Sequence, residues 1–203
     1  MPAIGITGGV ATGKSAFCEC LRQIVPAAKF FNADEAAHGL LELPAVKKKI
    51  DAQFGNDVFS RNGDLNRERL RAIVFGDATK KRALERILHP RIRRQWKAEA
   101  TKHRNSPDFF FADIPLLYES GGEILCDRVV VVACSYKTQL ARLVVRMSLK
   151  DSEAEQMIKA QMPLEQKIGQ ADHVVWNEGP RAVLMEQARF LAALWQQQLW
   201  RTR

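Results

Sequence analysis

The feature that most constrains this chain is a glycine-rich segment near its start. Residues 3 to 15 read Ala-Ile-Gly-Ile-Thr-Gly-Gly-Val-Ala-Thr-Gly-Lys-Ser. A short apolar run, typical of a buried strand, is followed by the pattern G-x-x-x-x-G-K-S, and the residues after Ser15 continue with helical spacing. This strand–loop–helix context favours a phosphate-binding loop of the Walker A type over a plain glycine turn.

The residue types in this loop suit a polyphosphate. Glycines let successive backbone N–H groups turn toward an anion, and the helix that follows adds its positive N-terminal end. Lys14 can reach the β- and γ-phosphates, and the Ser15 hydroxyl can hold a magnesium ion. We therefore expect a nucleoside triphosphate site formed by Gly8, Gly9, Val10, Ala11, Thr12, Gly13, Lys14, Ser15 and Ala16.

Further strands are expected at intervals along the chain, with helical segments between them. The apolar runs lie at 29–31, 109–112, 128–133 and 173–176. Strands that alternate with helices predict a doubly wound α/β fold with a five-stranded, mostly parallel sheet. Within one kinase-like domain we expect a core of 1–35, 105–141 and 171–203, a helical acceptor-binding insertion at 36–104 and a helical lid at 142–170.

Two carboxylates follow predicted strands. Asp34 comes after the second strand, where a side chain would point into the ligand crevice of a parallel sheet, although it could equally cap the next helix. Asp113 ends the apolar run that begins at Phe109, so it resembles a Walker B acid that reaches magnesium. An acid at a strand end is common in any protein, which is the plainer alternative for Asp113.

Basic residues in two helical segments could also contact ligands. Arg142 and Arg146 are four residues apart, hence on one helix face, and two guanidinium groups could clamp phosphates or simply face solvent. His89 precedes Pro90, where we expect one helix to end and another to begin. His89 is either part of an acceptor site or a packed histidine at a helix junction.

Composition narrows the function classes. The net charge of +8 suits a protein that handles polyphosphates, and it also raises a nucleic-acid-binding alternative. No basic stretch interleaved with aromatic residues is present, so we expect no nucleic-acid partner. The four cysteines form no C-x-x-C pair, the first strand leaves no room for a signal peptide, and no apolar run has membrane-spanning length. We expect a reduced, cytoplasmic protein without a membrane partner.

From Ile4 to about Gly179 the sequence resembles the dephospho-CoA kinase family. The LHP and PLL-aromatic-E signatures, in this order, are specific to that family among phosphate-loop kinases. The matching segments are Thr7 through Ser15, Ala33-Asp34, Phe54-Gly55, Leu88-His89-Pro90, Pro115 through Glu119, Asp127-Arg128-Val129, Gln139 with Arg142 and Arg146, Ala160-Gln161-Met162, Ala171-Asp172, and Asn177 with Gly179.

The resemblance implies transfer of the ATP γ-phosphate to the ribose 3′-hydroxyl of dephospho-CoA, the final step of coenzyme A synthesis, with ATP and Mg²⁺ as cofactors. ATP and dephospho-CoA are then the partners of a monomer or weak homo-oligomer. A phosphate-loop kinase for another small acceptor, a nucleotide or a sugar, is the alternative. At Ala11 and Asn32 the chain departs from the family pattern, which usually has a glycine and an acid there.

The resemblance also implies roles for individual residues. Asp34 would orient or deprotonate the 3′-hydroxyl, with Lys14 and Arg142 as its catalytic partners. His89 and Leu116 would contact the acceptor. Lid residues Arg142 and Arg146 would close on the phosphates, Asn177 would lie near the adenine, and Ser15 and Asp113 would serve the metal.

Overall fold

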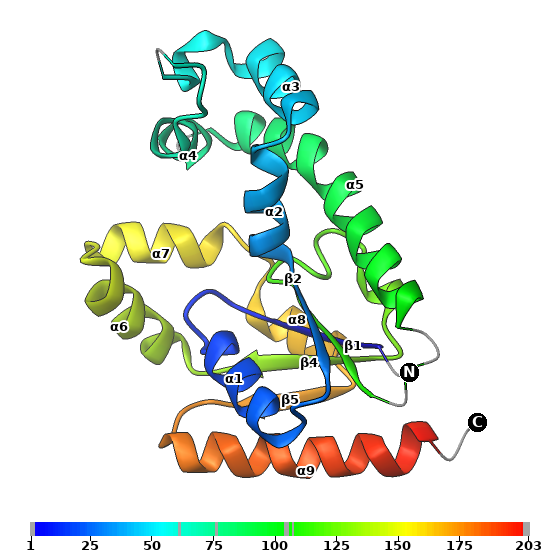
Figure 1. Ribbon diagram of the computed structural model, residues 1–203. Coiled ribbons are helices and arrows are strands. Elements are labelled where there is room, and N and C mark those ends of the chain that lie inside the picture. The colour runs from blue at the N-terminus through cyan, green and yellow to red at the C-terminus, as the bar shows by residue number, and fades with distance from the viewer. Residues whose placement is uncertain (1–2, 61, 76, 104–105, 107, 201–203) are drawn as a thin grey trace. The chain divides into compact units, whose positions relative to one another are not determined.

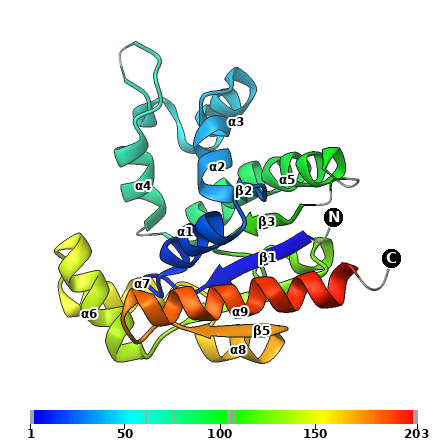
Figure 2. The ribbon, with the colours of Figure 1, turned by 60° about the horizontal axis from the view of Figure 1, so that its bottom comes forward.

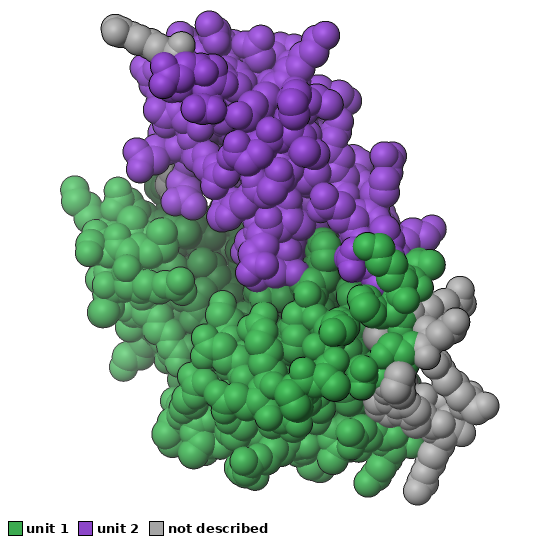
Figure 3. Space-filling view, in the orientation of Figure 1, with its two compact units in different colours: residues 1–31, 100–203 green, residues 32–99 purple. Residues whose placement is uncertain are grey.

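The computed structural model describes residues 3–60, 62–75, 77–103, 106 and 108–200 (Figure 1). The chain divides into two compact units, coloured separately in Figure 3. One unit contains residues 1–31 and 100–203, and the other contains residues 32–99. The sequence predicted a helical insertion at 36–104.

A five-stranded sheet forms the centre of the larger unit. Its strands are β1 (Ala3–Gly8), β2 (Lys29–Asn32), β3 (Phe110–Asp113), β4 (Arg128–Ala133) and β5 (His173–Trp176). They lie in the order β2-β3-β1-β4-β5, and β1 pairs in parallel with both β3 and β4, while β4 pairs in parallel with β5. The predicted doubly wound α/β fold is therefore confirmed.

One face of the sheet is covered by α1 (Lys14–Ile24) and α9 (Arg181–Trp200), which run side by side in Figures 1 and 2. Ile4 and Ile6 of β1 are fully buried there with Phe17 of α1 and Trp195 of α9. Alternate residues of a strand face opposite sides, so Gly5 faces the other layer. A Cβ atom at Gly5 would lie 2.8 Å from the Leu117 side chain, so glycine permits this layer to pack closely.

Three helices of the larger unit fall in the region predicted to be a lid. They are α6 (Tyr136–Met147), α7 (Asp151–Lys159) and α8 (Leu164–Gln170). The predicted lid boundary at residue 142 falls inside α6. Helix α6 is capped by Ser135, whose hydroxyl accepts a hydrogen bond from the Thr138 N–H.

The smaller unit is helical and has its own apolar core. Its helices are α2 (Ala33–Leu41), α3 (Pro44–Phe54), α4 (Arg67–Phe75) and α5 (Ala78–Lys102), the last of which continues into the other unit, with a short 3₁₀ turn at Asn56–Val58. The core side chains are apolar and buried, and include Leu40, Val46, Ile50, Val58, Leu70 and Leu88. The unit can therefore pack around its own centre.

The predicted helix break at Pro90 is wrong, because α5 runs through it as one helix. Proline removes the N–H that would bond to the carbonyl of residue 86. At the next step of the helix, the Arg91 guanidinium donates to the Ile87 carbonyl at 2.7 Å. Leu88 and Trp96 are buried on either side of the proline. Packing on both sides and a side-chain donor outweigh the local preference to stop.

Among the described helices, none is both long enough and apolar enough to cross a bilayer.

His173 of β5 is a histidine whose charge is disfavoured by the fold. Its ring packs against Trp195, with the ring centroids 5.9 Å apart. Burial lowers the pKa of His173 below its ordinary value of 6.5, although the Asp172 carboxylate acts in the opposite direction. The neutral imidazole is therefore the form that the folded state favours.

This shift predicts a loss of stability in mild acid. Below about pH 6.5 the unfolded chain binds more protons at His173 than the folded chain does. The free energy of unfolding therefore decreases as the pH is lowered. We expect it to fall more for the wild type than for His173→Leu when urea unfolding is compared at about pH 7.5 and pH 5.5. Equal losses in the two proteins would contradict the assignment.

Candidate active site

The loop between β1 and α1 leaves a row of backbone N–H groups available. Gly13 precedes α1 in a left-handed conformation, with φ 93°, and no side chain caps the helix. The first helical bond runs from the Phe17 N–H to the Gly13 carbonyl. Among the described residues, no acceptor is found for the N–H groups of residues 14 to 16. The first turn also contains no acidic side chain, so this helix end is suited to an anion.

The carbonyl groups of the same loop are all occupied. Each carbonyl of residues 8 to 12 accepts a hydrogen bond from a side chain, and the donors are Lys167, Thr12, Gln139, Arg142 and Asn177. A carbonyl oxygen repels a phosphate, whereas an N–H group attracts it. Because side chains hold these carbonyls, the backbone is oriented before any phosphate arrives.

Two positions in the loop have demanding backbone geometry. Gly13 lies against Asn177, whose side-chain amide donates to the Thr12 carbonyl at 2.9 Å, and a Cβ atom at Gly13 would overlap that amide. Ala11 adopts φ 59°, a left-handed conformation that glycine reaches more easily. The loop therefore keeps a glycine-like backbone at Ala11 without a glycine there.

Lys14 and Asp113 form an ion pair at the carboxyl end of the sheet. Asp113 ends β3, and Lys14 begins α1. Both side chains are largely buried, with exposed fractions of 13% and 6%. Cys18, one helical turn after Lys14, faces the same carboxylate, and burial first and Asp113 second raise the pKa of its thiol to about 12. Cys18 is thus a neutral packing group beside the charged pair.

The two arginines of α6 have different surroundings. Arg142 donates to the Thr12 carbonyl at 3.3 Å and to the Asn177 carbonyl at 2.8 Å, so it bridges the loop and the chain after β5. Arg146 is exposed, and the described residues offer its guanidinium no hydrogen bond or ion pair. Glu178, which also follows β5, accepts hydrogen bonds from Ser135 and Thr138 at the start of α6 and so connects this segment to the helix. The same hydrogen bonds hold the pKa of the Glu178 carboxyl below its usual range.

Asp34 stands in the first turn of α2, in the smaller unit, with an exposed carboxylate. The alternative that Asp34 caps this helix is wrong, because Asn32 is the cap. The Asn32 side chain accepts hydrogen bonds from the N–H groups of Asp34 and Glu35 at 2.9 and 3.1 Å. Capping by the neighbour leaves the Asp34 carboxylate available for other contacts.

His89 lines a hollow on one face of α5. The hollow has a volume of about 530 Å³, and its lining residues are Thr79, Arg82, Glu85, Arg86, His89 and Pro90. Two guanidinium groups and an imidazole face one carboxylate, that of Glu85, so the lining has an excess of basic groups that favours an anion.

Two further predicted site residues, Leu116 and Ser15, belong to the larger unit. Leu116 stands in the turn after β3 and is half-buried, while Ser15 is exposed at the start of α1. Their roles toward acceptor and metal stay predictions, as do those of Asp34, His89 and Asn177.

Sequence reasoning missed Lys167. Its ammonium group is fully buried and bonds to the Gly8 and Pro115 carbonyls and to Glu119. The available signal was its place in a short amphipathic helix, three residues after Leu164 and therefore on the same face. Gln139 and Gln161 entered only as parts of family motifs, yet they bond to the carbonyl and the N–H of Val10.

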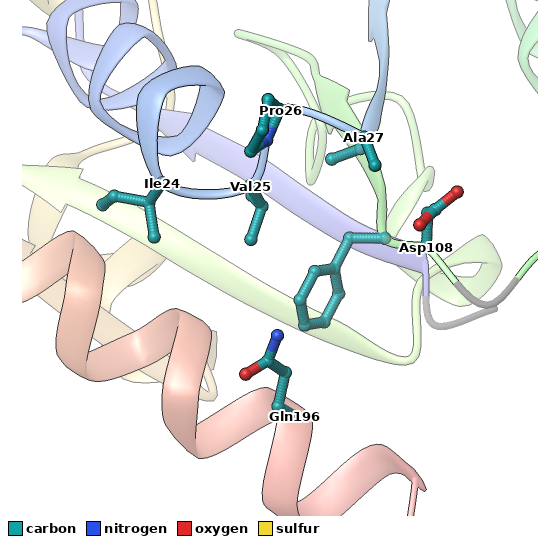
Figure 4. Close-up of a pocket in the computed structure, with 8 residues that line it drawn as sticks. Ile24, Val25, Pro26, Ala27, Asp108 and Gln196 are labelled. Atoms are coloured by element: carbon teal, nitrogen blue, oxygen red, sulfur yellow. The ribbon is translucent and has the colours of Figure 1, made fainter.

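A second hollow of about 500 Å³ lies near the amino ends of β2 and β3, at the opposite edge of the sheet from the loop (Figure 4). Among the described residues its lining is mostly apolar, and the charged residue there is the acid Asp108, which does not suit a polyphosphate. The ion pair of Lys14 and Asp113 lies instead at the carboxyl end of the sheet, next to the loop.

Comparisons with known proteins identify the family of the chain. A family model described as dephospho-CoA kinase matches residues 2–182. The chain is 41% identical to a dephospho-CoA kinase of Symbiobacterium thermophilum, over 88% of this chain and 75% of the relative. It is 40% identical to one of Anaeromyxobacter dehalogenans, over 96% and 92%. The solved dephospho-CoA kinase of Campylobacter jejuni is 25% identical and superposes with a TM-score of 0.72, covering 96% of this chain and 97% of the other.

The contact between Gly13 and Asn177 predicts the effect of a single methyl group. In Gly13→Ala the new Cβ must displace the Asn177 amide, and alanine resists the left-handed φ. We expect the dissociation constant for ATP with magnesium to rise at least about tenfold in isothermal titration calorimetry.

Gly39→Ala is the matched control, because a Cβ atom at Gly39 inside α2 would meet nothing within 4 Å. It should leave ATP binding unchanged and slightly raise the unfolding temperature. If Gly13→Ala binds ATP as tightly as this control does, the loop geometry described here is not the one that grips the nucleotide.

Proposed function

The chain belongs to the dephospho-CoA kinase family, and from this premise we propose that it transfers the γ-phosphate of ATP to the 3′-hydroxyl of the dephospho-CoA ribose, which completes coenzyme A synthesis. The observation that carries the proposal is the loop of residues 8 to 16. Its carbonyls are bonded to side chains and its last N–H groups are available, next to the Lys14–Asp113 pair.

In this proposal the phosphates of ATP bind in this loop. The N–H groups at the start of α1 bind the phosphate oxygens, and the helix end adds a favourable field. Lys14 turns from Asp113 to the terminal phosphates, where its charge offsets the negative charge that builds up during transfer. Phosphoryl transfer needs little covalent help from the protein, so this positioning and charge neutralisation account for most of the rate.

Magnesium fits the residues at this edge of the sheet. Among the described residues, no cluster of three or more His, Cys, Asp or Glu side chains could hold a metal alone. Magnesium in kinases is bound mostly by phosphate oxygens and water, with one or two protein oxygens. Ser15 and Asp113 supply such oxygens, and the metal would neutralise charge on the phosphates.

The acceptor is assigned to Asp34, His89 and Leu116, as the family resemblance implies. Asp34 orients the 3′-hydroxyl and accepts its proton. Its carboxylate is exposed and is not used to cap α2, which supports this role. His89 and the two arginines of the α5 hollow bind the anionic part of dephospho-CoA, a diphosphate, while Leu116 contacts its apolar part.

The lid residues complete the site. Arg146, exposed at the end of α6, closes on the phosphates, while Arg142 holds the loop and presents its remaining N–H groups. Asn177, which follows β5, lies beside the adenine. A lid that closes over both substrates excludes water and so suppresses hydrolysis of ATP.

The biological setting follows from this activity. The protein acts on ATP and dephospho-CoA in the cytoplasm as a monomer or weak homo-oligomer, with neither nucleic acid nor membrane as a partner. The net charge of +8 would then attract the negatively charged polyphosphate substrates.

Acceptor choice is tested by offering several alcohols separately. We expect ADP release from ATP with dephospho-CoA to exceed the release with adenosine, shikimate or gluconate by at least about a hundredfold in kcat/KM, because only dephospho-CoA presents a diphosphate to the α5 hollow. A coupled assay for ADP measures this directly. A higher value with any of the other acceptors would assign the protein to a different kinase reaction.

Asp34→Asn tests the role of the carboxylate. The amide keeps the shape but cannot take the proton, so we expect turnover to fall about a hundredfold or more with ATP binding nearly unchanged. Glu35→Gln is the control, since it neutralises the neighbouring carboxylate in the same helical turn and should retain turnover. Equal turnover in Asp34→Asn and Glu35→Gln would remove Asp34 from the mechanism.

A further inference from the structure

Lys167 is a fully buried lysine in the unit that contains the phosphate loop. Its ammonium group has three donors and meets three acceptors. They are the Gly8 carbonyl at 3.3 Å, the Pro115 carbonyl at 3.0 Å and the Glu119 carboxylate at 2.9 Å. Each donor therefore has a partner, and the buried charge has a counter-ion.

The three acceptors belong to separate parts of the site. Gly8 is the first glycine of the phosphate loop, and Pro115 follows the strand that ends in Asp113. The Pro115 carbonyl also accepts from the Thr7 hydroxyl at 3.0 Å, and Glu119 also accepts from the Met162 N–H at 3.0 Å. Lys167 thus joins the loop, the segment after β3 and the connection between α7 and α8.

Simple packing does not account for a lysine at this position. Burying an ammonium group costs free energy that an ion pair often only balances, and an apolar side chain of similar length would fill the space more cheaply. Of the three bonds that the ammonium group makes, the one to the Gly8 carbonyl reaches the phosphate loop. That bond holds the carbonyl away from the side of the loop where the N–H groups are available.

A second contact links the same region to the loop. Gln161, in the connection between α7 and α8, accepts a hydrogen bond from the Val10 N–H at 2.9 Å. Lys167 and Gln161 therefore hold the loop at two positions, Gly8 and Val10. A rearrangement of α8 would change the contact that Lys167 makes, and the contact of Gln161 lies just before this helix.

We propose that Lys167 is a positioning residue for nucleotide binding, which fixes the phosphate loop and couples it to helix α8. The proposal rests on the ATP-binding function given above. Because coupling between two sites is reciprocal, a nucleotide in the loop stabilises α8, just as α8 stabilises the loop. The contact with Glu119 keeps the ammonium group in place, whereas the contact with Gly8 acts on the nucleotide site.

The decisive variant is Lys167→Met, which preserves the length of the side chain and removes all three donors. We expect its dissociation constant and its KM for ATP to rise about tenfold, because a charged hydrogen bond to the loop is lost. The KM for dephospho-CoA should stay within about twofold, and kcat should fall less than about threefold. A general loss of structure would not produce this split.

Hydrogen exchange gives a second readout. In the wild type, ATP should slow exchange at the backbone N–H groups of residues 162–168, and in Lys167→Met this protection should disappear. Lys159→Met is the surface control, because Lys159 is exposed and forms an ion pair with Glu155 in the same helix, α7.

Folded Lys167→Met that binds ATP within about twofold of the wild type would overturn the proposal. If that variant does not fold, Gln161→Ala decides, since it removes only the contact at Val10. A rise of about threefold in the dissociation constant for ATP, with reduced protection of residues 162–168, supports the coupling, and no change in either overturns it. A wild type that neither binds ATP nor releases ADP would refute the proposed function instead.

Discussion

The arrangement depends on one constraint, which is that the carbonyl groups of a phosphate-binding loop must be satisfied away from the phosphate. A loop contains as many carbonyls as N–H groups, so a turn of backbone alone would present both to an anion. Here the donors come from distant parts of the chain: Gln139 and Arg142 from α6, Lys167 from α8 and Asn177 after β5. The glycine motif makes the required conformation accessible, and these side chains select it.

Much of the fold could be predicted because its signals are local. The apolar runs identified the strands, and their alternation with helices identified the parallel sheet, which is confirmed together with membership of the family. The prediction failed at Pro90, where a local rule competed with packing. Leu88 and Trp96 are buried on either side of the proline, so the helix gains more by continuing than it loses at one hydrogen bond.

The site was only partly predictable for a related reason. The position of Lys14 follows from the loop motif, and the rule for acids at strand ends led to Asp113, with which Lys14 is paired. For Lys167 the one signal is its spacing of three residues from Leu164, and this signal is outweighed because a lysine on a helix usually faces solvent. Its burial depends on acceptors from residues 8, 115 and 119, which become neighbours only after folding. Asp34 and His89 stay predictions, since their roles involve a substrate that the fold does not contain.

The same constraint explains why the loop tolerates one departure from the family pattern and not another. Ala11 adopts a left-handed conformation that costs a non-glycine residue about 1 kcal/mol or more. The Ala11 carbonyl accepts from Arg142, so a contact from outside the loop helps to offset that cost. The methyl group of Ala11 is accommodated, whereas one at Gly13 would overlap Asn177. Glycine is therefore required where a side chain presses on the backbone, and it is replaceable where donors outside the loop hold the required φ.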